Sequence, residues 1–179
     1  MKSIRRTSIL GAAIATLAVA ALPASARSAT TGAYSRLDEE LLRSSIQGDR
    51  FEIAGGELAQ AKAVAPRTRA LGARLAKDHA KSLKEAVKVA RTLGISVPGD
   101  PTPSQEWELL MVDAQSGTAF DAAYSRLEIQ DHKQDIEETH TEIDKGLNPS
   151  IRHLARTDLP ILRTHLQLSK QAWWSRPGK

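Results

Sequence analysis

The sequence has 179 residues, with 25 basic, 21 acidic and five histidine side chains and no cysteine. Without cysteine, disulfides and thiolate metal ligands are excluded, so a hydrophobic core must hold the fold. Three of the basic residues lie in the first 26 positions, which leaves 22 basic against 21 acidic residues in the rest of the chain. This near-neutral balance gives no reason to expect a nucleic-acid partner.

The first 26 residues have the pattern of a cleaved signal peptide. A basic start is followed by an apolar run over 9–22 and by the small residues Ala24, Ser25 and Ala26. The run is shorter than the roughly 20 apolar residues that a membrane-spanning helix needs. We therefore expect an exported protein, located in the periplasm or at the periphery of the outer envelope. The pair Arg5-Arg6 leaves twin-arginine export open beside ordinary secretion.

The remaining chain is expected to form one domain, because 153 residues can bury about two-thirds of their unfolded surface. We expect a flexible linker over 27–34, a helical domain over 35–174 and a short tail over 175–179. No alternating strand pattern is present. Apolar periodicity and capping residues instead predict four long helices and a short one, over about 35–64, 66–93, 103–115, 118–145 and 149–174.

The connections between these helices predict the topology. Short turns near Pro66 and Asn148 should form two antiparallel hairpins, whereas the link over 94–117 is long and holds the short helix. Its extended residues, at about 3.3 Å each, and its helix together can span the length of a bundle. The fold class is therefore expected to be all-α, a ferritin-like four-helix bundle with a long crossover between the second and third long helices.

Three histidines, His79, His132 and His165, fall on the apolar stripes of three different predicted helices. Glu52 lies 14 residues before Pro66 and His79 lies 13 after it, while His132 and His165 each lie 16 or 17 residues from Pro149. At about 1.5 Å per residue, all four should meet near the middle of the bundle. Glu128, one turn before His132, can join them.

Neutral imidazoles and carboxylates together can bind a transition-metal ion such as zinc, iron, manganese or copper. The alternative is structural, because each buried histidine could simply be satisfied by a neighbouring carboxylate, hydroxyl or carbonyl. His140 and His153 lie off the apolar stripes and are expected at the surface.

Four segments resemble a bacterial exported domain family of unknown function in the ferritin-like superfamily. They occur in order across the chain, at 51–59 (FEIAGGELA), 75–79 (LAKDH), 120–124 (FDAAY) and 159–166 (LPILRTHL). The resemblance spans about 44–173 and implies a ferritin-like bundle. Members of this family are often labelled outer-membrane proteins and have no demonstrated activity.

The resemblance does not imply ferritin chemistry. Di-iron bundles use Glu-x-x-His on two helices, but here Ala76 precedes His79 and Leu162 precedes His165 at that spacing. A ferritin-type di-iron centre is therefore not expected. The metal hypothesis that remains is a mononuclear site formed by the three histidines with Glu52 or Glu128.

A row of basic residues lies on the opposite side of the second predicted helix. This basic row consists of Arg74, Lys77, Lys81, Lys84, Lys88 and Arg91. Residues 67–93 carry a net charge of +6 and residues 118–145 a net charge of −5. The basic row could bind an anionic envelope surface or an acidic protein partner. Alternatively, it is a solvated face whose charges pair with acidic neighbours.

No Ser-His-Asp spacing, cysteine nucleophile or glycine-rich phosphate loop is present, so hydrolytic or nucleophilic catalysis is not expected. Gly55-Gly56 is interpreted as a close-packing site within the first helix. The leading functional hypothesis is a non-enzymatic exported protein that acts through its surface. The alternative is a metal-binding or redox protein that uses the His/Glu cluster. The oligomeric state stays open.

Overall fold

The computed structural model describes residues 33–175, which form five α-helices and no strand. The expectation of an all-α fold is confirmed. The helices are α1 (Arg36–Lys62), α2 (Pro66–Leu93), α3 (Pro103–Asp113), α4 (Gly117–Lys145) and α5 (Pro149–Ser175). Each boundary lies within two residues of the sequence-based estimate. The expected signal peptide, and most of the expected linker and tail, lie outside the described residues.

Local sequence signals explain where the helices begin and end. Ser35 and Asp38 form a capping box before α1, and Thr102 and Gln105 form the expected one before α3. The α2 helix ends at Gly94, whose φ of 70° lies in the left-handed region that glycine adopts without steric cost. The sequence thus specifies the helix ends independently of the packing.

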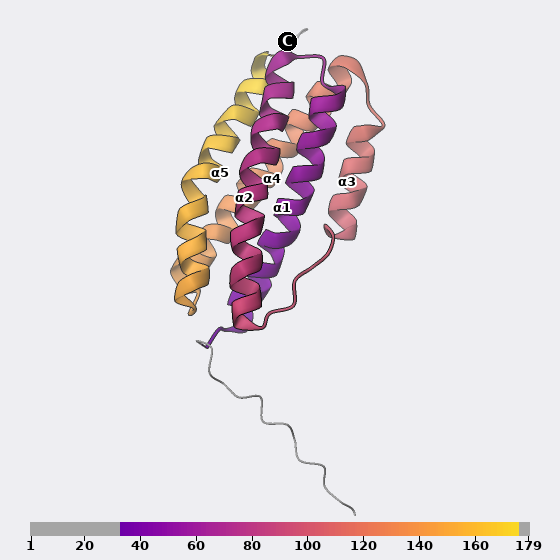
Figure 1. Ribbon diagram of the computed structural model, residues 1–179. Coiled ribbons are helices and arrows are strands. Elements are labelled where there is room, and N and C mark those ends of the chain that lie inside the picture. The colour runs from indigo at the N-terminus through magenta and orange to yellow at the C-terminus, as the bar shows by residue number, and fades with distance from the viewer. Residues whose placement is uncertain (1–32, 176–179) are drawn as a thin grey trace, which may run out of the picture.

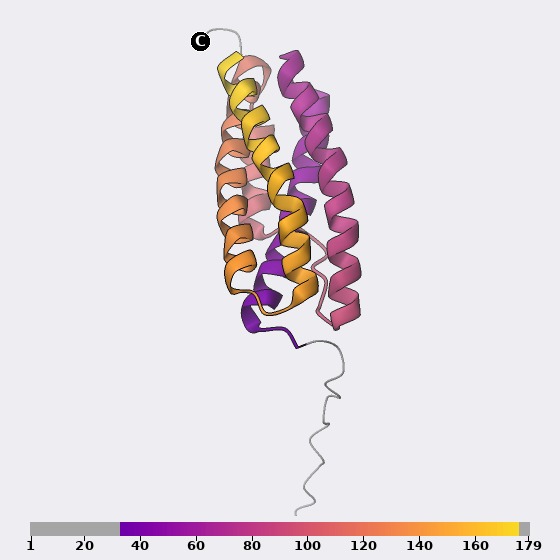
Figure 2. The ribbon, with the colours of Figure 1, turned by 90° about the vertical axis from the view of Figure 1, so that its left-hand side faces the viewer.

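The four long helices pack side by side as a bundle (Figures 1 and 2). The α1 helix packs mainly against α2, α4 mainly against α5, and α2 also contacts α5. The link between α2 and α4 runs along the outside of this bundle, and its helix α3 contacts α1 and α4 (Figure 1). None of the helices in the described part of the chain combines the length and apolar character needed to cross a membrane.

Two glycines bring the backbones of α1 and α2 into direct contact. A Cβ atom added at Gly56 would lie 2.5 Å from the carbonyl oxygen of Gly72, and one added at Gly72 would lie 2.6 Å from the Cβ of Ala59. Neither position has room for a side chain. The close packing expected at Gly56 is therefore present, and it fixes the separation of the two helices.

The apolar core is divided into two clusters, one toward each end of the bundle. One contains Leu71, Leu75, Phe120 and Tyr124 near the α1–α2 turn. The other contains Leu42, Ile46, Ala86, Ala90 and Ile151 near the α4–α5 turn. The helix positions between the two clusters are occupied by buried polar side chains, namely Asp49, Glu52, His79, Glu128, His132 and His165. We call these six residues the polar layer.

The buried face of α4 differs from the expected one. Ile129, Ile136 and Ile143 share the helical spacing of the predicted stripe that contains His132, but each of them is only half-buried. His132 is fully buried as expected, and Glu128, which lies off that stripe, is fully buried as well. Apolar periodicity therefore finds the buried imidazole and misses the carboxylate that the helix turns toward the bundle interior.

Candidate metal centre

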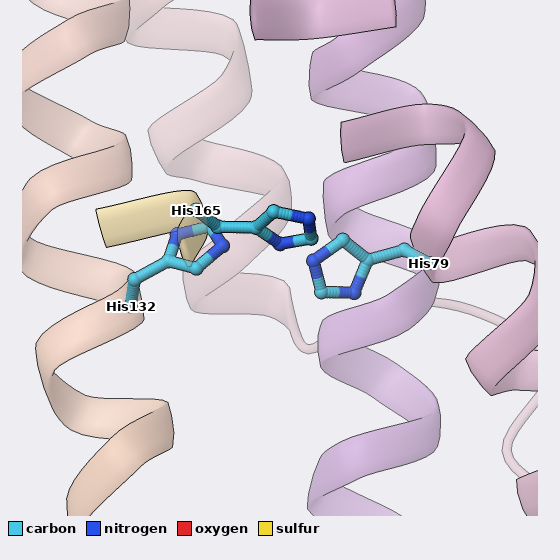
Figure 3. Close-up of side chains that lie close together, drawn as sticks. All are labelled: His79, His132 and His165. Atoms are coloured by element: carbon cyan, nitrogen blue, oxygen red, sulfur yellow. The ribbon is translucent and has the colours of Figure 1, made fainter. Parts of the chain in front are cut away.

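The rings of His79, His132 and His165 lie together in the polar layer, and each comes from a different helix (Figure 3). The ring centroids are 5.7 Å apart for His79 and His132, and 5.2 Å apart for each of the other two pairs. One nitrogen from each ring lies within 4.8 Å of the other two. The structure therefore brings together the three histidines that helix counting placed at one height.

Carboxylates hold the outer nitrogens of two of these rings. The Nδ1 atom of His79 lies 2.8 Å from Oδ1 of Asp49, and Nε2 of His165 lies 3.1 Å from Oδ2 of Asp78. Because an ionised carboxylate only accepts hydrogen bonds, these two nitrogens carry the ring hydrogens. The other nitrogen of each ring, Nε2 of His79 and Nδ1 of His165, is then left with its lone pair.

A backbone carbonyl holds the outer nitrogen of the third ring. The Nδ1 atom of His132 lies 2.9 Å from the carbonyl oxygen of Glu128, one helical turn earlier. Because a carbonyl oxygen only accepts, Nδ1 donates and Nε2 of His132 carries the lone pair.

The three lone-pair nitrogens have no partner among the described residues. Nε2 of His79, Nε2 of His132 and Nδ1 of His165 are all buried and accept no hydrogen bond. Buried polar atoms in folded proteins nearly always have a partner, so three such atoms in one place require an explanation. The structural alternative accounts for one nitrogen of each ring and leaves the other unexplained.

Burial also keeps two of the rings, His132 and His165, neutral at ordinary pH. It lowers the pKa of His132 well below the usual value, and the neighbouring His79 and His165 lower it further. Burial, followed by the charge of His79, lowers the pKa of His165 to about 4. A neutral imidazole has a lone pair available, so these two side chains can act as ligands without first losing a proton.

The partners of the outer nitrogens, Asp49 and Asp78, were missed by the sequence analysis. Burial alone would raise the pKa of Asp78, but hydrogen bonds from Arg74 and His165 outweigh it and lower that pKa. Although Asp78 directly precedes His79 in the sequence, the histidine that its side chain contacts is His165, which lies on another helix. A carboxylate on the far nitrogen of a histidine is common in metal sites, where it orients the ring.

The two glutamates of the predicted site lie beside His132. Its Nδ1 atom is 3.5 Å from Oε1 of Glu52 and 3.7 Å from Oε2 of Glu128. Glu52, Glu128 and His132 thus form a second group with ligand atoms within 4.8 Å of one another. The two glutamates lie at the Nδ1 side of the His132 ring. The lone pair of this ring is on Nε2, at the side of the ring that faces His79 and His165 (Figure 3). The five predicted residues are close together but form two groups that share His132.

A cavity of about 570 Å³ reaches the histidine cluster from the side of the α4–α5 turn. Its wall includes His79 and His165 and the carboxylates of Asp49, Asp135 and Asp158. Burial, together with the charge of Asp49, raises the pKa of Asp158 to about 6. An acidic lining attracts cations, so the cavity provides a suitable route to the rings.

The basic row lies on the exposed surface of α2, since all six of its side chains are exposed. The ion pairs of the basic row are formed with acidic residues of α2 itself. Arg74 and Lys81 pair with Asp78, and Lys88 pairs with Glu85. No ion pair with the acidic helix α4 is present among the described residues. His140 and His153 are exposed, as expected.

These features define a class of protein, a helical bundle with a buried cluster of histidines and carboxylates that could hold a metal ion. The chain belongs to the family described as "Domain of unknown function (DUF4142)", whose model matches residues 23–172. No curated protein matches the chain.

Two solved structures share the fold. A DUF305 fragment from Deinococcus radiodurans superposes with a TM-score of 0.70 at 12% identity, covering 79% of this chain and 97% of that one. CopM in its Cu(II)-bound form superposes with a TM-score of 0.64 at 16% identity, covering 76% of this chain and 95% of that one. At these identities the similarity establishes a common fold and nothing about ligands.

Proposed function

We propose that this protein binds a divalent transition-metal ion through His79, His132 and His165. The observation that carries the proposal is the direction of the three rings. Each outer nitrogen is held by an acceptor, and each inner nitrogen is buried without a partner. A metal ion at the centre of the cluster satisfies all three at once, as in sites with three protein ligands and one open position.

The donor set favours copper(II), followed by zinc(II). All three ligands are imidazole nitrogens, and the one methionine within the described residues, Met111, is exposed. Sites of this kind bind Cu²⁺ more tightly than other divalent metals of the first transition series. Fold similarity to a protein solved with Cu(II) agrees with this choice. The glutamates of a ferritin-type di-iron centre are replaced by Ala76 and Leu162, so we propose metal binding without ferroxidase activity.

The test is a metal titration of the purified protein followed by elemental analysis. We expect one tightly bound Cu²⁺ or Zn²⁺ per histidine cluster. At a free metal concentration 100 times Kd, the ion should raise the free energy of unfolding by about 2.7 kcal/mol.

The matched variants are His165→Ala, which removes a ligand, and His140→Ala, which removes an exposed histidine. Loss of a direct ligand should weaken binding by more than the roughly 10–100-fold typical of an outer partner. Equal affinities in the two variants would contradict the proposal.

We also propose that the protein is exported and acts in the periplasm or at the outer-envelope periphery. The N-terminal sequence supports this, with its basic start, its apolar run over 9–22 and its Ala24-Ser25-Ala26 end. Fractionation of cells that express the full chain tests it. A protein that stays with the cytosolic fraction at its full mass would exclude export.

For the architecture, we propose a ferritin-like four-helix bundle in which the α2–α4 link is a crossover. The pairing of α1 with α2 and of α4 with α5 supports two hairpins. The course of the link beside α1 supports a connection that travels the length of the bundle (Figure 1). An experimental structure in which α2 and α4 run antiparallel would exclude the crossover.

A second candidate function is attachment to an anionic envelope surface through the basic row. The supporting observation is that its six cations are all exposed while their recorded partners lie on α2 itself. The same row could instead contact an acidic protein partner. The basic row meets the proposed metal site at Asp78, which pairs with Arg74 and Lys81 and also contacts His165.

A further inference from the structure

Glu52 and Glu128 form a pair of buried carboxylates without a counter-ion. Both side chains are fully buried, and all four of their carboxylate oxygens lack a hydrogen-bond donor among the described residues. Nδ1 of His132 lies 3.5 Å from Glu52 and 3.7 Å from Glu128. This nitrogen donates its hydrogen to the backbone carbonyl of Glu128 instead. Two negative charges cannot remain in such a place without protons or a cation.

A buried tyrosine packs beside this pair. The hydroxyl group of Tyr124 is fully buried and also lacks a partner among the described residues. Burial, followed by the charges of Glu128 and Glu52, raises the pKa of this hydroxyl well above its usual value. The Tyr124 ring and Glu128 meet the same point of α1, because a Cβ added at Gly55 would lie 3.6 Å from Cε2 of Tyr124 and 3.7 Å from Oε1 of Glu128.

We propose that Glu52 and Glu128 bind a second divalent cation, of the oxygen-liganded class represented by Mn²⁺, at the Nδ1 side of His132. Carboxylate oxygens are the ligands that this class of ion prefers, and two carboxylates balance its two charges. The Tyr124 hydroxyl is placed to complete the oxygen set. The ring of His132 then stands between a nitrogen-liganded ion on one side and an oxygen-liganded ion on the other.

The geometry supports one shared site, because Glu52 on α1 and Glu128 and His132 on α4 place ligand atoms within 4.8 Å of one another. The second site does not depend on the three-histidine site, because its carboxylate ligands are different and only the His132 ring is shared.

The test is a titration with Mn²⁺, followed by electron paramagnetic resonance, on full-length protein loaded with one equivalent of Zn²⁺. We expect one further bound Mn²⁺ per chain. The double variant Glu52→Gln/Glu128→Gln should lose at least 100-fold in Mn²⁺ affinity and keep its zinc. The isosteric amides preserve volume, and circular dichroism and thermal melting confirm that the variant is folded.

His79→Ala is the reciprocal variant, because it removes a ligand of the first site only. It should lose zinc and still bind Mn²⁺, so failure of the first site and failure of the second give different results. Zinc-loaded wild-type protein that binds no Mn²⁺ at millimolar concentration would overturn the proposal. So would equal Mn²⁺ affinity in wild type and the double variant. Either outcome would leave a pair of carboxylates that hold protons alone.

Discussion

Buried carboxylates occur both near the ends of this bundle and in its middle, and they differ in whether they accept hydrogen bonds. Near one end, Asp121 accepts hydrogen bonds from the backbone nitrogens of Val64 and Ala65 at 3.2 and 2.9 Å. In the polar layer, Glu52 and Glu128 are equally buried and accept none among the described residues. Burial alone therefore does not identify a binding group.

The other end of the bundle follows the first pattern. Asp38 accepts from the backbone nitrogens of Leu147 and Asn148 at 2.9 and 3.0 Å, and so joins the start of α1 to the α4–α5 turn. Burial would raise the pKa of Asp38, but hydrogen bonds from Ser35 and from the backbone of Asn148 lower it. Asp121 and Asp38 thus fasten the turns, whereas the carboxylate oxygens of Glu52 and Glu128 stay without a donor among the described residues.

The largest effect on stability is expected at a satisfied carboxylate. Asp121→Ala leaves two backbone N–H groups near the α1–α2 turn without their acceptor, at about 1–3 kcal/mol each. We expect the free energy of unfolding to fall by about 3 kcal/mol, measured by urea denaturation. Asp113→Ala is the control, because it removes an exposed ion pair with Lys62 worth less than about 1 kcal/mol. Similar losses in both variants would contradict the structural role of Asp121.

The stability that Glu128 contributes should change with pH in the direction opposite to that of Asp38, because the pKa of Asp38 is lowered and that of Glu128 is raised. Glu128 has a folded-state pKa of about 8, above its usual value of 4.5, so the unfolded chain loses its proton first as the pH rises. Its contribution to stability is complete below about pH 4.5 and is lost as the pH rises through about 8. Metal-free protein should therefore become progressively less stable through this group between pH 5 and 8.5.

Glu128→Gln tests this dependence, because the amide cannot ionise. Its stability, measured by urea denaturation across the same pH range, should change less than that of the wild type. A variant with an unchanged pH dependence would show that the folded protein accommodates the ionised carboxylate.

The outer partners of the histidines should affect metal affinity more than stability. Asp49→Asn and Asp78→Asn keep the shape of the side chain and weaken its hold on His79 and His165. We expect each to lower affinity by about 10–100-fold, measured by competition with a chelator. Asp144→Asn on α4, which is absent from both metal-ligand groups, is a suitable control. Unchanged affinity in both variants would mean that the rings are oriented by packing alone.

The smallest effect is expected from exposed charges, which water already solvates. Lys84→Ala removes one exposed cation from the basic row. If the row attaches to an anionic surface, partition onto anionic vesicles at low salt should fall about fivefold, since one basic group contributes about 1 kcal/mol. Added salt should weaken the binding of both proteins to the vesicles and reduce the difference in partition between wild type and variant. Identical partition at low salt would support the solvated-face interpretation.

The sequence predicted the helices and the meeting of the histidines, because both depend on periodicity and on length along a helix. His79, His132 and His165 could be placed at one height by counting from Pro66 and Pro149. Ring orientation could not be predicted in this way. The pairing of His165 with Asp78 joins different helices, and it depends on side-chain rotation.

The buried face of α4 was missed for a related reason. An apolar stripe is a good guide where a core is apolar, but here the interior position is taken by Glu128 and Ile129 is half-buried. A sequence rule that places charges outside fails at the polar layer. The same failure is a useful signal, because an acidic residue one helical turn before a buried histidine, as in Glu128 and His132, marks such a layer.

The contact between Gly56 and Gly72 has a consequence for the choice of ion. Glu52 lies one turn from Gly56 on α1, and His79 lies two turns from Gly72 on α2. Side chains can rotate to follow ions of different radius, but two backbones already in contact cannot approach any further. The minimum width between α1 and α2 at the polar layer is therefore set by backbone atoms. If the two proposed sites are occupied, discrimination between small and large cations depends on two glycines that contact neither ion, because a rigid backbone limits how far flexible ligands can move.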